Sequence, residues 1–206
     1  MSVAMAMENK LNLRHYLEMR GPLVYLQKLD TTFTERYQQY MGKLDVAGRI
    51  LTTTAQVFSG EDIERYIHRV TADSSRIDFL VFDCAAQRLV GEVVIADIDL
   101  QNRSAHLRIA IAQEQDFGKG YGTEAMLLAL YHGFGMLPLH RIELEVLPYN
   151  TRAIHVYEKL GFVQEGIRRD ACYFNHRYYD VVTMSLLEDT FRQRYLAGLE
   201  PLESLF

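Results

Sequence analysis

In the first third of the chain, apolar residues recur mainly at the spacing of amphipathic helices. A Gly-Pro break at residues 21–22 precedes the apolar run Leu23–Leu26, which predicts a first strand. Aromatic and apolar residues between 33 and 43 recur every three or four positions and predict a helix. Ser59, followed by Asp62, resembles a capping box and predicts the start of a second amphipathic helix. Residues 20–75 are therefore expected to contribute one strand and two helices.

From residue 76 onward the pattern changes to runs typical of strands. Three runs separated by turn residues predict an antiparallel meander: Ile77–Phe82, Leu89–Ile98 and Ala105–Ala112. Farther along we expect helices Thr123–Phe134 and Thr151–Leu160, and strands Arg141–Leu147, Phe162–Ile167 and Tyr179–Leu187. Gly161 is a suitable stop for the second of these helices. This order predicts a mixed α/β domain around one central sheet.

Composition narrows the class of protein. A chain of 206 residues, 49% hydrophobic and 24% charged, suits one folded domain over 1–206. The net charge of -5 gives no electrostatic reason to expect a nucleic acid partner. Cys84 and Cys172 have no metal-ligand spacing and suit a reducing compartment. Because no apolar run approaches the roughly 18–20 residues that span a bilayer, we expect a soluble cytoplasmic protein with no metal and no membrane partner.

The C-terminal tail, residues 188–206, is expected to be partly helical. It carries the apolar residues Tyr195, Leu196, Leu199, Leu202, Leu205 and Phe206. A free tail seldom exposes that much apolar surface. The tail therefore favours a homo-oligomer, a dimer or larger.

Candidate chemistry begins with the glycine-rich segment 115–125, which precedes a predicted helix. Such a turn can present backbone N–H groups and a helix dipole to a phosphate. Residues 120–125 also match the dinucleotide fingerprint G-x-G-x-x-A, with Glu143 and Glu145 about 20 residues later. Against that alternative, five residues separate the strand from the first glycine. The loop also lies beyond the midpoint of the chain, and a dinucleotide site leaves segment 150–162 unexplained.

Segment 150–162 places Asn150 and Tyr157 seven positions apart, on one face of a short helix. Together with Gln115–Gly120, written R/Q-x-x-G-x-G/A, its pattern N-x-x-A-x-x-x-Y-E-K-L-G-F resembles the GCN5-related N-acetyltransferase (GNAT) family. The resemblance covers roughly residues 76–187. It implies a single GNAT-like domain whose central sheet is mixed, mostly antiparallel, contains a splayed strand and is flanked by helices.

The resemblance also implies an acetyl-CoA site. Backbone groups of Ile109, Ala110 and Ile111 would pair with the pantetheine arm, and Asn150 would contact it. The pyrophosphate would be bound by the loop residues Gln115, Phe117, Gly118, Lys119, Gly120, Tyr121, Gly122 and Thr123. Two ordinary roles stay open, because Lys119 can be a solvated lysine and Asn150 a helix N-cap.

Tyr157 resembles the family's general acid, which reprotonates the departing CoA thiolate. A phenol, with a reference pKa near 10, is roughly matched to a thiol near 8.5. The general base is less specified by the sequence. Glu145 matches a glutamate of ribosomal-protein N-terminal acetyltransferases, and Glu143, Glu92 or a water chain are alternatives.

The acceptor is expected to be a polyamine such as spermidine. Segments 103–106, 153–162 and 174–181 resemble spermidine N-acetyltransferases, although His176 stands where that group usually has glycine. Carboxylates that could bind an extended cation are Asp30, Glu35, Asp45, Glu61, Asp62 and Glu64, or these could form ordinary solvated helix faces. Two alternatives remain open: acetylation of a protein or peptide α-amine, and a non-catalytic acyl-CoA-binding domain.

Overall fold

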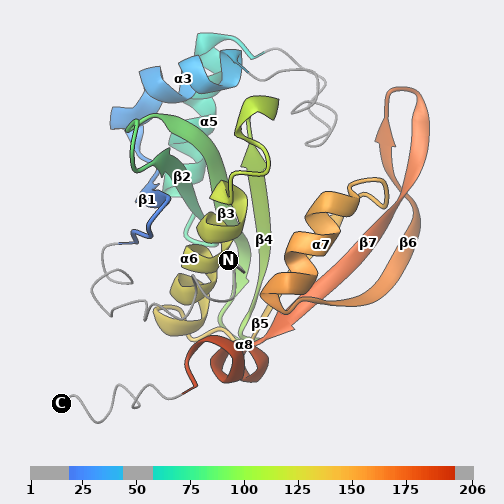
Figure 1. Ribbon diagram of the computed structural model, residues 1–206. Helices are drawn as coiled ribbons and strands as arrows, with labels where there is room; N and C mark the ends of the chain where they lie inside the picture. Colours follow the sequence, from blue (N-terminus) through green and yellow to red (C-terminus); the bar gives the residue numbers. More distant parts are fainter. Residues whose placement is uncertain (1–18, 44–57, 198–206) are drawn as a thin grey trace, which may run out of the picture.

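The computed structural model describes residues 19–43 and 58–197 (Figure 1). The strands are β1 Val24–Lys28, β2 Ile77–Asp83, β3 Leu89–Asp99, β4 Ser104–Ile111, β5 Arg141–Val146, β6 Val163–Phe174 and β7 Arg177–Leu187. The helices are α3 Thr34–Gly42, α5 Gly60–Ala72, α6 Tyr121–Gly135, α7 Thr151–Leu160 and α8 Glu188–Tyr195. Short 3-10 turns occupy Thr31–Phe33 (η1) and Glu114–Asp116 (η2).

The strands form one seven-stranded sheet in the order β1-β2-β3-β4-β5-β7-β6. Neighbouring strands are antiparallel except for β4 and β5, which run parallel. Helices α3 and α5 pack on one face through Tyr37, Ile63 and Ile67. The other face carries the larger core, to which α6, α7 and α8 contribute. The predicted mixed, mostly antiparallel sheet flanked by helices is confirmed.

The strand β4 leaves β5 soon after the two meet. Their parallel pairing covers only Ser104–His106 opposite Arg141–Glu143. Beyond His106, β4 continues along β3 as far as Ile111, while β5 continues along β7 as far as Val146. Figure 1 shows the two strands diverging from this point. The splayed strand that the sequence implied is therefore present, and we call the space between the diverging strands the β4–β5 gap.

Helix boundaries agree with their sequence signals. The Ser59 hydroxyl accepts a bond from the Asp62 N–H at 3.2 Å, and the Asp62 carboxylate accepts one from the Ser59 N–H at 3.0 Å. This capping box begins α5, and Ile67 lies on its buried face. Helix α7 ends at Gly161, whose φ of 102° is readily adopted only by glycine.

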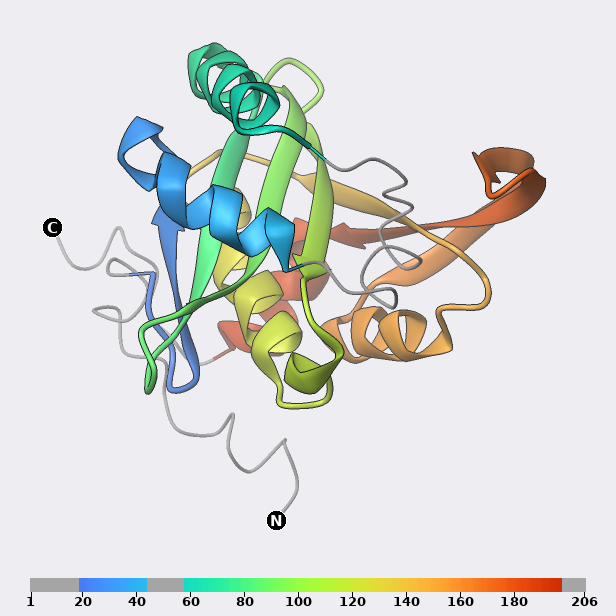
Figure 2. The ribbon, with the colours of Figure 1, turned by 90° about the horizontal axis from the view of Figure 1, so that it is seen from above.

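The two C-terminal strands are longer than the sequence pattern predicts. They form a hairpin that extends away from the rest of the molecule in both views (Figures 1 and 2). Its outer part was missed because most of β6 is exposed on both faces and has no apolar alternation. The turn contains Asn175 and His176, both with positive φ. His176, which stands where the resemblance implies glycine, thus adopts a conformation that favours glycine.

The first part of the predicted apolar tail packs within its own chain. Phe191 of α8 is 1% exposed, and Tyr195 and Leu196 pack against the larger core. These residues therefore give no support to the predicted homo-oligomer. The other apolar tail residues, Leu199, Leu202, Leu205 and Phe206, lie outside the described residues, as does Asp45.

Two further properties concern residues 19–43 and 58–197 alone. None of their helices is both long enough and apolar enough to cross a bilayer. Within the same ranges, no group of three or more His, Cys, Asp or Glu side chains is arranged to hold a metal ion. Cys84 and Cys172 are both free thiols.

Candidate active site

The β4–β5 gap exposes one edge of β4. Ile109, Ala110 and Ile111 pair with β3 on one side, but their other side faces the gap, where β5 no longer pairs with them. Backbone groups on such an edge can bond an extended ligand that carries amides. The three residues expected to contact a pantetheine arm are therefore placed where an arm could run.

The glycine-rich loop leads directly into α6. Gly118 and Gly120 have φ values of 75° and 89°, which favour glycine. Gly120 is the N-cap of α6, and no side chain caps this helix among the residues described. The first-turn N–H groups, in Tyr121, Gly122 and Thr123, thus begin a 15-residue helix without a side-chain acceptor. A helix start of this kind suits an anion such as a pyrophosphate.

An ion pair that the sequence analysis missed holds the loop. The carboxylate of Asp116, 2% exposed, accepts two bonds from the Arg88 guanidinium, one of them at 2.8 Å. Burial opposes ionisation of Asp116, but the bonds from Arg88 outweigh it, so its pKa is lowered. Lys119 lies 3.3 Å from the same carboxylate with its side chain 47% exposed, so it is both paired with Asp116 and in contact with solvent. No local signal pairs two residues that lie 28 positions apart.

Gln115 and Phe117 have different surroundings. The Gln115 amide donates to the Gln113 side chain at 2.9 Å within the turn around η2. The Phe117 ring lies 4.1 Å from the guanidinium of Arg152, in the first turn of α7. A cation over an aromatic face is attractive. The contact joins the loop to the helix that carries Asn150 and Tyr157.

Asn150 and Tyr157 occupy the start and the middle of α7. The side-chain oxygen of Asn150 accepts a bond from the Ala153 N–H at 3.2 Å, so the structural role considered for Asn150, an N-cap, is confirmed. Tyr157 is 8% exposed and lies in the larger core, with its ring 6.1 Å from that of Phe162. Burial raises the pKa of Tyr157 to about 12. The phenol is therefore neutral and able to donate a proton.

The candidate carboxylates lie on the opposite face of the sheet. On β5, Ile142, Leu144 and Val146 face the core that contains Tyr157, so by strand alternation Glu143 and Glu145 face the other way. Each is paired. Glu145 forms an ion pair with Arg168, and Glu143 bonds Arg141 at 2.8 Å and lies 3.5 Å from His106 Nδ1.

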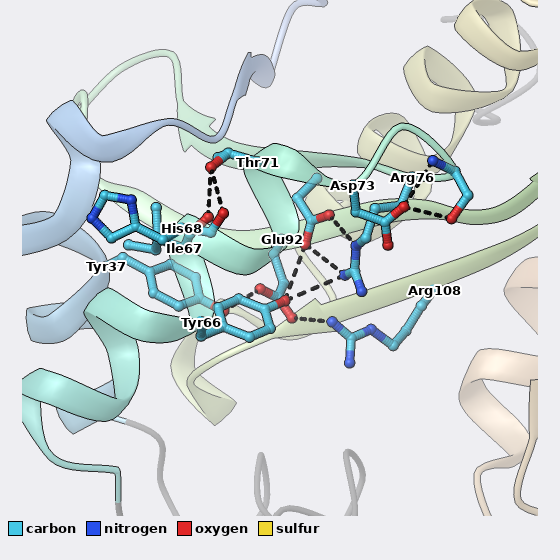
Figure 3. A network of polar contacts seen from close by, with 11 residues as sticks. Tyr37, Tyr66, Ile67, His68, Thr71, Asp73, Arg76, Glu92 and Arg108 are labelled. Atoms are coloured by element: carbon cyan, nitrogen blue, oxygen red, sulfur yellow. Dashed lines mark hydrogen bonds and ion pairs between the residues drawn. The ribbon is translucent and has the colours of Figure 1, made fainter.

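Glu92, the third candidate, belongs to a polar network on the same face (Figure 3). Its carboxylate accepts a bond from Tyr37 of α3 at 2.6 Å and one from Arg108 of β4 at 2.9 Å. The Tyr66 ring stacks on Tyr37 with centroids 6.0 Å apart, and its hydroxyl bonds Asp78 at 3.0 Å. The sequence indicates Glu92 as a candidate but gives no sign of its partners, because only strand register and helix packing bring them together.

The acidic residues proposed to bind a polycation have mainly local roles. Asp30 caps η1 by accepting the Thr32 N–H at 2.8 Å, and Asp62 belongs to the capping box. Glu35 accepts a bond from Gln39 at 3.4 Å. Glu61 and Glu64 are exposed on α5. These contacts agree with solvated helix faces.

Several known proteins are similar to this chain in sequence. A family model described as an acetyltransferase (GNAT) domain matches residues 26–163. A spermidine N(1)-acetyltransferase of Vibrio cholerae is 35% identical over 136 residues, 66% of this chain and 78% of that protein. A Bacillus subtilis protein provisionally named ribosomal N-acetyltransferase YdaF is 34% identical over 100 residues, 48% of this chain and 54% of that protein.

A solved structure is also similar. The spermidine N-acetyltransferase of Vibrio cholerae in complex with CoA and spermine superposes with a TM-score of 0.73 at 28% identity. The match covers 82% of this chain and 97% of the other. The sheet and the helices around it are therefore shared over nearly the whole of that protein.

Proposed function

Because this chain belongs to the GNAT acetyltransferase family, we propose that it transfers the acetyl group of acetyl-CoA to a primary amine of a polyamine such as spermidine, with Tyr157 as the general acid. Membership of the family makes it an N-acetyltransferase that uses acetyl-CoA as donor. The similar spermidine acetyltransferases support a polyamine acceptor. The observation that carries the mechanism is the buried, neutral phenol of Tyr157. Tyr157 lies on α7, which contacts the loop before α6 through Arg152 and Phe117. That loop leads into the start of α6, which has no side-chain cap.

Residues on both sides of the gap fit the donor substrate. Backbone groups of Ile109–Ile111 would pair with the pantetheine amides, and backbone N–H groups from Phe117 to Thr123 would hold the pyrophosphate. The Arg88–Asp116 pair keeps this loop in shape. Asn150 caps α7 through its oxygen and would turn its amide N–H groups toward the pantetheine arm.

The reaction proceeds by direct attack. The acceptor nitrogen attacks the acetyl carbonyl, a C–N bond forms, the C–S bond breaks, and its electron pair leaves on sulfur. Tyr157 donates its proton to that sulfur. A phenol with a pKa of about 12 is a weaker acid than a thiol in water. In a buried site, however, desolvation also raises the proton affinity of the thiolate, which makes the transfer feasible.

The acceptor must also lose a proton, and the candidate carboxylate bases lie on the face of the sheet opposite Tyr157. A protonated amine cannot attack, so a carboxylate or water must receive that proton. We assign this role to Glu145, because it lies on β5 beyond the last β4–β5 pair and so borders the gap. Its ion-pair partner Arg168 is 60% exposed and can move away at little cost. Glu143, Glu92 and water are the alternatives.

A peptide α-amine is the second candidate acceptor. The three candidate carboxylates are paired with guanidinium groups, Glu92 with Arg108, Glu143 with Arg141 and Glu145 with Arg168. That pairing lowers the net negative charge available to a polycation and favours a singly charged amine. The similar protein named for ribosomal acetylation agrees with this candidate.

Thiol release from acetyl-CoA with a panel of amines tests the proposed function. The panel contains spermidine, spermine, putrescine, free amino acids and short peptides. We expect turnover with spermidine and spermine. Turnover with peptides alone would replace the polyamine by an α-amine acceptor. Acetyl-CoA binding without turnover of any amine would indicate a non-catalytic acyl-CoA-binding domain.

The pH dependence tests the assignment of Tyr157. Since burial raises its pKa to about 12, the acid form persists throughout the ordinary pH range. We expect kcat to rise with pH as the acceptor amine loses its proton, and to show no alkaline fall up to about pH 10. The measurement is kcat at saturating substrates from pH 6 to 10. An alkaline fall centred near pH 9, without unfolding, would contradict a buried neutral phenol as acid.

A further inference from the structure

Glu92 is a buried carboxylate on the sheet face that also carries Glu143 and Glu145. Its side chain is 11% exposed and is held by the Tyr37 hydroxyl at 2.6 Å (Figure 3). Burying an ionised carboxylate is unfavourable unless a cation or strong donors compensate its charge. In the free protein, Arg108 is the cation that does so, at 2.9 Å.

The two members of this pair differ in mobility. The Arg108 side chain is 58% exposed, so its guanidinium, which also interacts with Tyr66, has a direct path into solvent. Glu92 is fixed by the bond from Tyr37 and by the packing of α3 over the sheet. A cation that reaches Glu92 can therefore replace Arg108. Glu92 itself stays in place when Arg108 moves into solvent.

The position of the pair is suited to an acceptor amine. Glu92 of β3 lies directly opposite Ala110, which belongs to the stretch of β4 proposed to pair with the pantetheine arm of the donor. Arg108 precedes Ala110 by two residues and shares its face of β4. Tyr40 also reaches this stretch, its hydroxyl lying 3.4 Å from the Ala110 carbonyl oxygen. The tyrosine rings of α3 and the alkyl part of Arg108 would flank an aliphatic amine chain.

We propose that Glu92 binds an ammonium group of the acceptor, and that Arg108 is a resident counter-ion which the acceptor displaces. The inference rests on the proposed function, since it concerns the acceptor of the same reaction. It makes Arg108 a specificity-determining residue. Because the acceptor must displace the Arg108 guanidinium, a higher concentration of acceptor is needed for binding. The displaced guanidinium stays nearby, and its positive charge disfavours the most highly charged amines.

Equilibrium binding tests the proposal without relying on chemistry. Spermidine is titrated calorimetrically into the full chain saturated with CoA, which allows no acetyl transfer. Glu92→Gln should weaken spermidine binding about tenfold or more, because it removes the charge that pairs with the ammonium. Arg108→Gln should tighten binding several-fold, more for spermine than for putrescine. In the Glu92→Gln background, Arg108→Gln should no longer tighten binding.

A matched control separates this exchange from net charge. Arg65 of α5 pairs with Asp62 at 2.6 Å, and Arg65→Gln removes the same single charge without touching Glu92. It should leave spermidine affinity within about twofold, as expected for an exposed, screened charge. Equal tightening by Arg65→Gln and Arg108→Gln would overturn the proposal, as would unchanged affinity in Glu92→Gln.

Arg108→Gln leaves Glu92 without its counter-ion and could therefore destabilise the protein. A second measurement, the unfolding temperature with and without spermidine, keeps the proposal testable in that case. Spermidine should then raise the unfolding temperature of this variant more than that of the unchanged chain. An equal rise in both would also overturn the proposal. Failure of the proposed function appears separately, as absence of polyamine turnover in the unchanged chain. If the amine panel identifies another acceptor, the same titrations use that amine.

Discussion

Replacing Tyr157 by phenylalanine is expected to lower kcat about a hundredfold or more, with little change in acetyl-CoA affinity. The substitution removes only the hydroxyl and leaves the ring packed beside Phe162. Without the phenol, the thiolate must leave unprotonated or take its proton from water, which a buried site excludes. Stopped-flow or steady-state thiol release gives kcat, and equilibrium titration gives the dissociation constant of acetyl-CoA.

Tyr195→Phe is the matched control for this substitution. Tyr195 packs against the same core, and its hydroxyl bonds the Leu160 carbonyl at 3.3 Å. Tyr195→Phe likewise removes one tyrosine hydroxyl, from a half-buried ring at the border of that core, so a general effect of losing such a hydroxyl should appear in both variants. If Tyr157→Phe kept at least half of the original kcat, Tyr157 would not be the acid. A parallel loss of acetyl-CoA binding would indicate a role in binding instead.

Gly91→Ala is expected to have the second large effect, on stability and donor binding together. A Cβ at this position would lie 2.6 Å from the Ala110 carbonyl oxygen and 2.7 Å from Ile111 Cδ1. The first contact is with backbone and cannot be relieved by a side-chain rotation, so β4 must shift. We expect the free energy of unfolding to fall by about 1–3 kcal/mol, as for overpacking in a core. The KM for acetyl-CoA should rise about tenfold, since misplacement of a binding strand weakens its bonds.

Gly166→Ala provides the comparison, because nothing lies within 4 Å of a Cβ at Gly166, which also belongs to a strand. It should change stability by no more than about 0.5 kcal/mol. Urea unfolding and steady-state kinetics on both variants make the measurement. Equal effects of the two substitutions would show that loss of glycine flexibility, not the contact with β4, is responsible. A fall in stability of Gly91→Ala without a change in its KM for acetyl-CoA would show that Ile109–Ile111 do not bind the donor.

The elements that sequence reasoning located well carry their signals locally. Helix α7 was predicted with both of its ends, because Asn150 caps its start and Gly161 adopts the left-handed conformation at its end. The start of α5 followed from Ser59 and Asp62 in the same way. Candidate positions for the donor also followed from local pattern, because a glycine loop before a helix is a feature of neighbouring residues.

The contacts that define the rest of the site are not local. Arg88 meets Asp116 across 28 positions, and Tyr37 meets Glu92 across 55. A sequence shows such residues as isolated charges or aromatics, with no pattern that joins them. Only the register of the sheet and the packing of α3 bring them together. The outer half of the β6–β7 hairpin was missed for a related reason, since an element exposed on both faces has no buried side to impose alternation.

The short pairing of β4 with β5 has a consequence for the protein in the cell. With only three residue pairs between these strands, the sheet has an internal edge as well as its two outer edges. Unpaired strand edges invite association with other chains unless something covers them. A donor bound along Ile109–Ile111 would cover this one, and its departure would uncover it again. CoA and its thioesters, by binding only the folded protein, would then stabilise it against unfolding and association to an extent that depends on their concentration.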